Sequence, residues 1–161
     1  MRRLIVATGA LALAAFAVQP AAAQVRFGAN ANFATDTDFG LGAKLNFGVG
    51  NVTENKAIEG QATFDIYFPD GYDYWTIAAN GLYSLKPTGS VVPQLGAGLG
   101  VGRSSVSVLG VSASSTDVFL NLIGAIKFRP SGSIQPFAEA RFQIGDGSQL
   151  VLGGGLYFGK R

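Results

Sequence analysis

The sequence predicts an all-β protein, an eight-stranded antiparallel up-and-down transmembrane β-barrel. Three observations lead to this prediction. Apolar and polar residues alternate at period two along most of the chain after residue 23. Glycine is abundant, with 23 residues, whereas only 14% of the residues are charged. Finally, the alternating segments have roughly the ten-residue length of tilted strands that cross a bilayer.

The first 23 residues have the three-part pattern of a secretory signal peptide. Arg2 and Arg3 form a cationic start, and residues 4–18 are uncharged and apolar. Ala21-Ala22-Ala23 then provides a small-residue cleavage site. The apolar run is shorter than the ~20 residues that a spanning helix needs. We therefore expect residues 1–23 to be cleaved and residues 24–161 to form the barrel.

Eight segments of the remaining chain alternate between an apolar and a polar face. Val25, Phe27 and Phe33 share one face of the first segment, and Arg26 and Asn30 lie on the other. An even number of antiparallel strands can close with both ends of the chain on one side, and closure is required because hydrocarbon does not tolerate an open edge. The predicted strands cover residues 25–33, 39–48, 58–68, 76–85, 94–102, 120–128, 134–144 and 150–158.

The connections between these segments fit such a layout. Residues 86–93 and 129–136 are near-copies, each with a basic residue, a proline and then a glycine, which is typical of a type I turn. Residues 103–116 form the longest connection, at the opposite end, as either a mobile loop or an extended hairpin. Residues 49–56 are longer than a tight turn, and residues 34–37 are short for an outer loop.

The polar face predicts a narrow, crowded interior. Glycine, alanine, serine, asparagine and glutamine dominate it, and its few charges are of both signs. Confined charges need partners, because an unpaired charge in a low-dielectric space is costly. Glu139 and Arg141 lie two residues apart and share a face, and Arg26 is expected near them. The predicted interior ion-pair network is Arg26, Lys44, Glu59, Asp65, Lys127, Glu139 and Arg141.

Aromatic residues gather near the ends of the predicted strands, as in the aromatic girdles of membrane barrels. This placement favours an outward apolar face. Two alternatives remain open: a soluble sandwich with exposed charges, and a lipocalin-like barrel with its apolar face turned inward around a ligand. The aromatic residues in question are Phe33, Phe39, Phe47, Phe68, Tyr72, Tyr74, Trp75, Phe128 and Phe158.

The chain resembles the small OmpA/OmpX-type outer-membrane β-barrels. The resemblance covers residues 24–161 and rests on the signal peptide, the eight alternating strands, residues 93–100 and 136–141, and the aromatic last strand. It implies insertion into the bacterial outer membrane by the barrel-assembly machinery, which reads a terminal aromatic residue. In this chain Phe158 would fill that role, followed by Gly159, Lys160 and Arg161.

The composition excludes several chemistries. The chain has no cysteine and no histidine, so zinc fingers, thiol catalysis and a histidine base are excluded. The resemblance implies that enzymes among such barrels use a histidine, which this chain lacks. Asp70, Asp73, Asp117 and Asp146 match no calcium loop. Glycines 96, 98, 100 and 102 lack the helix that a nucleotide loop requires. We expect no catalytic residue, metal or cofactor.

The expected function is therefore a non-enzymatic outer-membrane barrel with a structural or surface-interaction role. Its expected partners are the lipid bilayer and the barrel-assembly machinery, and we expect a monomer. Nucleic acid is not expected, because no basic block supplies phosphate contacts. The alternatives are a narrow channel for small solutes or ions and a soluble periplasmic barrel that carries an apolar ligand.

Overall fold

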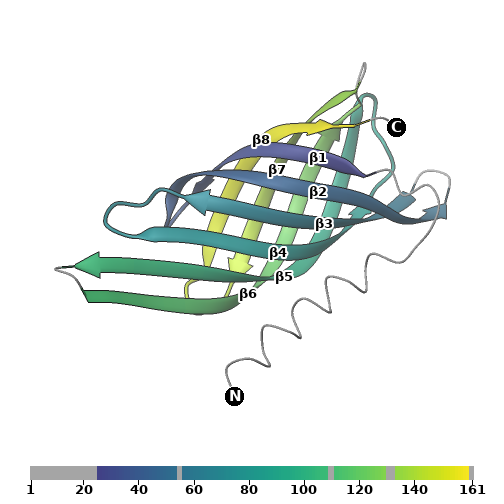
Figure 1. The fold of residues 1–161 in the computed structure, drawn as a ribbon. Helices are drawn as coiled ribbons and strands as arrows, with labels where there is room; N and C mark the ends of the chain where they lie inside the picture. The colour runs from purple at the N-terminus through teal and green to yellow at the C-terminus, as the bar shows by residue number, and fades with distance from the viewer. Residues whose placement is uncertain (1–24, 54–55, 109–110, 130–132, 160–161) are drawn as a thin grey trace.

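The computed structural model describes residues 25–53, 56–108, 111–129 and 133–159. The predicted signal peptide and the last two residues lie outside this part of the chain. The described residues form eight strands in one closed barrel, in the order β1 to β8, which confirms the predicted fold (Figure 1). The strands are β1 (Arg26–Ala34), β2 (Asp38–Thr53), β3 (Lys56–Tyr67), β4 (Asp73–Ser84), β5 (Val91–Val108), β6 (Val111–Phe128), β7 (Ile134–Ile144) and β8 (Gln149–Phe158).

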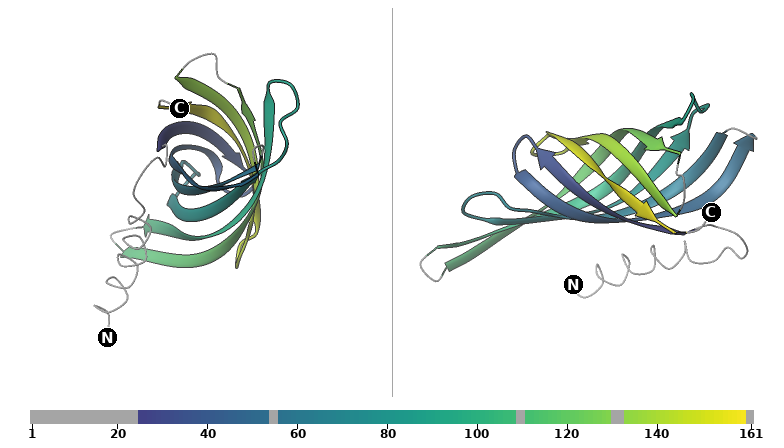
Figure 2. Two further views of the ribbon diagram at one scale, coloured as in Figure 1. Left: turned by 90° about the vertical axis from the view of Figure 1, so that its right-hand side faces the viewer. Right: turned by 90° about the horizontal axis from the view of Figure 1, so that it is seen from above.

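Each strand pairs antiparallel with the next along the chain, and the last closes on the first. Phe27 of β1 lies opposite Phe158 of β8, and Ala34 lies opposite Val151. The strands therefore surround a common axis (Figure 2). Among the described residues, no helix has the length and apolarity needed to cross a membrane.

Three strands extend well beyond the roughly ten residues expected. The β5 and β6 strands have 18 residues each, and β2 has 16. Of the two alternatives for the 103–116 connection, a mobile loop or an extended hairpin, the structure shows the hairpin. The β5 and β6 strands stay paired as far as Val108 and Val111. Likewise, residues 49–53 extend β2 and Lys56 starts β3, with register shifts at Gly48/Gly50 and Asn51/Thr53. Pairing outlasts the clean alternation because a hairpin outside the membrane needs no apolar face.

The two faces of the barrel have opposite chemistry. The outward face is apolar, with Phe27, Leu99 and Val118 each more than 60% exposed. The inward face holds most of the charged side chains of the strands, and Asp65 and Arg141 are at most 1% exposed. This arrangement is the reverse of a soluble carrier of an apolar ligand, which would bury its apolar face.

Aromatic residues on the outward face lie toward both ends of the strands. Phe158 is 42% exposed there and lies opposite both Phe27 and Ile134 in the sheet. Two of the expected girdle residues lie elsewhere. Tyr74 turns inward and packs with its ring centroid 5.6 Å from that of Tyr67, and Tyr72 lies at the mouth of the barrel.

Glycines on the inward face of β5 give room to the side chains of β4. A Cβ atom at Gly98 would lie 2.6 Å from Cα of Asn80, and one at Gly102 would lie 2.6 Å from the hydroxyl of Tyr74. Such separations are well inside van der Waals contact, so the bare backbone lets polar side chains of β4 lie across the interior.

Candidate functional site

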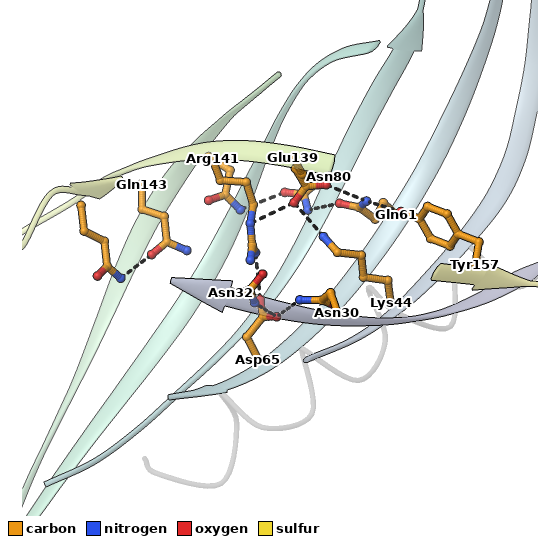
Figure 3. Close-up of polar contacts among 12 residues, drawn as sticks. Asn30, Asn32, Lys44, Gln61, Asp65, Asn80, Glu139, Arg141, Gln143 and Tyr157 are labelled. Carbon is orange, nitrogen blue, oxygen red and sulfur yellow. Dashed lines mark hydrogen bonds and ion pairs between the residues drawn. The ribbon is translucent and has the colours of Figure 1, made fainter. Parts of the chain in front are cut away.

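The centre of the barrel interior holds four charged side chains in direct contact (Figure 3). Lys44 Nζ of β2 lies 2.7 Å from Glu139 Oε1 of β7. Arg141, also on β7, contacts Glu139 Oε1 at 3.0 Å through Nε and Asp65 Oδ2 of β3 at 2.8 Å through Nη1. All four side chains are buried. The alternation of β2, β3 and β7 turns these residues inward, and barrel closure brings them together.

Amide side chains connect this charged centre to the other strands. Asn30 and Asn32 of β1 donate to Asp65 at 3.0 and 2.6 Å. Gln61 donates to Glu139 at 3.4 Å and to the hydroxyl of Tyr157 on β8 at 3.2 Å. The chain continues across β4 and β6, because Asn80 donates to Gln61 at 2.9 Å and Asn121 donates to Asn80 at 3.0 Å. Seven of the eight strands thus contribute to one hydrogen-bonded layer across the interior.

A second group of contacts lies nearer the end of the barrel where β1 begins and β8 ends. Lys127 pairs with Glu59, which also accepts hydrogen bonds from Asn46 at 3.1 Å and from Gln94 at 3.3 Å.

Arg26 lies away from the residues expected beside it. Its guanidinium donates to Gln135, whereas we expected it beside Glu139 and Arg141. Arg26 opens β1, and Gln135 lies at the same end of the barrel, near the start of β7. Glu139 lies four residues further along β7, so strand register places it deeper in the interior.

Two of the inward aromatic rings, those of Phe137 and Tyr157, lie near the interior lysines, and neither was expected there from the sequence. Lys44 Nζ lies 5.4 Å from the ring centroid of Phe137, and Lys127 Nζ lies 5.1 Å from that of Tyr157. The two rings stack at 4.4 Å. These distances fit cation–π contacts. The alternation of the sequence could have indicated this for Phe137. It lies two residues from both Gln135 and Glu139, and it therefore shares the inward face of β7 with them.

The interior ion pairs contain equal numbers of cations and acids. Lys44, Lys127 and Arg141 are paired with the three acids Glu59, Asp65 and Glu139. Arg26, which is partly exposed, adds one further cation at the rim. A neutral set of paired charges avoids the cost of an isolated buried ion. The arrangement can hold opposed strands together and fill the interior.

The opposite end of the barrel opens into a small acidic cavity of about 150 Å³. Asp36, Asp117 and Asp146 line it, together with Tyr72 and Tyr74. In the part of the chain that the structure describes, no cluster of three or more potential ligands is arranged to hold a metal ion. Of the four aspartates considered in the sequence, Asp117 and Asp146 line this cavity, and Asp70 and Asp73 lie at the nearby β3–β4 connection.

A closed barrel with an apolar exterior and a paired, charged interior defines a transmembrane β-barrel. No protein-family model matches the chain, and no curated protein matches it. Solved structures do match, and all of those described next are under 25% identical to this chain. Their likeness therefore concerns the fold.

The N-terminal β-barrel domain of Pseudomonas aeruginosa OprF superposes with a TM-score of 0.69 at 14% identity, covering 84% of this chain and 96% of that one. The attachment invasion locus protein Ail of Yersinia pestis gives a TM-score of 0.67 at 15% identity, covering 85% and 95%. The outer-membrane enzyme PagL gives 0.52 at 14% identity, covering 83% and 97%. The fold is that of the small outer-membrane β-barrels of the OmpA/OmpX type.

Proposed function

We propose that this protein is a non-enzymatic, monomeric barrel of the bacterial outer membrane that stabilises the envelope and presents its loop end for surface interactions. Support comes from the layer of contacts around Lys44, Glu139, Arg141 and Asp65, which fills the middle of the interior. These buried side chains link opposed strands and occupy the interior through which ions would have to pass.

The non-enzymatic proposal rests on composition. The chain has no histidine or cysteine, and its interior carboxylates contact cations directly. A carboxylate held in an ion pair is a poor proton acceptor, which general-base catalysis would require. PagL shows that this fold can carry an enzyme, so the proposal depends on the side chains and not on the fold.

The experiment that tests the proposal is single-protein conductance in a planar bilayer. We expect the refolded barrel to insert and to give no steady ionic current, because the central layer blocks the path. Steady current would overturn the closed interior and support the alternative, a narrow channel for ions or small solutes. Migration of the sample as a folded, heat-modifiable band shows that an absence of current does not come from unfolded protein.

Biogenesis forms a separate part of the proposal. We infer that residues 1–23 direct export and are removed, and that the barrel-assembly machinery recognises Phe158 on the closing strand. The side chain lies on the outward face at the end of β8, next to β1 in the sheet. This is the position where an assembly factor can read the last strand before the barrel closes.

A further inference from the structure

The β6 strand carries an edge with no neighbouring strand on one side. It pairs with β5 from Val111 to Phe128, but its pairing with β7 covers only Leu120 to Lys127. Among the described residues, the stretch from Ala113 to Asp117 therefore has a strand partner on the β5 side alone. Figure 1 shows β5 and β6 continuing past their neighbours at this end of the barrel.

The hydrogen-bonding pattern identifies which backbone groups face the open side. The amide of Arg129 donates to Ser90 O on the β5 side at 2.6 Å. The carbonyl of Phe128, one residue earlier, faces β7 and accepts from Gln135 at 3.0 Å. Because backbone groups alternate in direction along a strand, the even-numbered residues of β6 point away from β5. Ser114 and Thr116 therefore direct their N–H and C=O groups to the open edge.

Residues 113–116 of this edge contain no lysine, proline or bulge. Strands whose edges meet water normally carry lysine, proline or a bulge that discourages added strands. Residues 113–116 read Ala-Ser-Ser-Thr, and all four are exposed. Their small, uncharged side chains leave space for another strand to approach the backbone.

The surroundings of the edge are strongly acidic. Six aspartates occupy the loop end of the barrel, against the single cation Arg103 among the described residues there. Asp117 follows the edge on the inward face and lines the mouth cavity. Arg103 lies on the outward side, where it donates to Ser114 Oγ at 3.2 Å. The aspartates are Asp36, Asp38, Asp70, Asp73, Asp117 and Asp146.

We propose that this edge binds an extended cationic segment of another protein as an added β-strand. The segment's backbone bonds to Ser114 and Thr116, and a lysine or arginine on its inward face lies against Asp117. A second copy of this chain is the poorer occupant, because edge-to-edge pairing would bring two acidic loop ends together. This inference rests on the proposed surface role and names the partner chemistry of that surface.

The test uses the full barrel in detergent micelles and a nine-residue capped peptide in which threonine and lysine alternate. The matched control peptide replaces each lysine with glutamate. We expect the lysine peptide to bind and to slow deuterium exchange at the amides of Ser114 and Thr116 by about tenfold or more. The glutamate peptide should leave both amides unchanged. Equal protection by both peptides, or by neither, would overturn the proposal.

Two variants of Thr116 separate edge pairing from general attraction. Thr116→Pro removes an N–H that points away from β5, so the barrel's own ladder is kept and an edge proline is tolerated. It should weaken peptide binding by about tenfold, whereas Thr116→Val, which keeps the N–H, should bind normally. Unchanged binding by Thr116→Pro would contradict strand addition.

The two remaining outcomes also decide the question. A dimer in light scattering, with the Ser114 and Thr116 amides protected without peptide, would assign the edge to a second copy and overturn the cationic partner. Conductance is measured separately. A barrel that conducts ions and binds the lysine peptide would refute the proposal of a closed interior but would leave the strand-addition site standing. A closed barrel that ignores the peptide would refute the strand-addition site alone.

Discussion

Replacing Glu139 with glutamine removes the carboxylate that contacts both Lys44 and Arg141. At an effective dielectric constant of about 20, the 2.7 Å contact with Lys44 corresponds to a gross attraction of roughly 6 kcal/mol. The 3.0 Å contact with Arg141 corresponds to roughly 5.5 kcal/mol. Desolvation of the ions offsets much of both. The expected net loss is about 3–5 kcal/mol, because Lys44 stays buried without a carboxylate partner while Arg141 keeps Asp65.

The assay is urea unfolding in lipid vesicles, followed by the mobility difference between unboiled and boiled protein on a detergent gel. Lys44→Met combined with Glu139→Gln removes both charges and should recover most of the loss, since replacing a buried pair by apolar groups is often neutral. Asp146→Asn, in the exposed β7–β8 turn, is the control and should change stability by less than about 0.5 kcal/mol. A loss below about 1 kcal/mol for Glu139→Gln, or no recovery in the double variant, would refute the reasoning.

Three further predictions use matched pairs. Ala97→Arg places a cation on the lipid face and should cost about 2–4 kcal/mol near the midplane, whereas Ala97→Leu should be tolerated; equal stability in vesicle unfolding would mean that the faces are reversed. Gly98→Ala crowds Asn80 and should destabilise by about 1–3 kcal/mol, whereas the outward Gly124→Ala has open space around it and should not; the same unfolding assay checks both. Phe158→Ala should lower the yield of folded barrel in cells, measured on a heat-shift gel, while deletion of residues 159–161 should not. The reverse result would mean that residues 159–161, and not Phe158, carry the assembly signal.

The strand count and the face assignment were predictable from the sequence because period-two alternation directly reports which side chains share a face. The ends of β2, β5 and β6 were not. Ser104, Ser105 and Ser114 give no apolar alternation, yet they stay in register because β5 and β6 remain paired along the hairpin. Alternation detects burial on one face, and an extramembrane ribbon has none.

Partners across the interior were less predictable than faces. Lys44 and Glu139 are 95 residues apart in sequence, and alternation shows only that both point inward. Which strands face each other across the barrel, and at what height, depends on strand tilt and stagger. Arg26 illustrates this limit. It lies nearer the end of the barrel than Glu139 does, and its partner is therefore Gln135.

The central claim is that the apolar face of the barrel meets lipid, and Trp75 tests it directly. It is the only tryptophan in the chain, and it lies near the loop end of β4, with its ring centroid 6.3 Å from that of Phe64. In vesicles that contain brominated lipids, we predict strong quenching of its fluorescence by bromines near the headgroups and weaker quenching by bromines near the bilayer centre. Trp75 fluorescence that is unaffected by either lipid but quenched by aqueous iodide would contradict the claim.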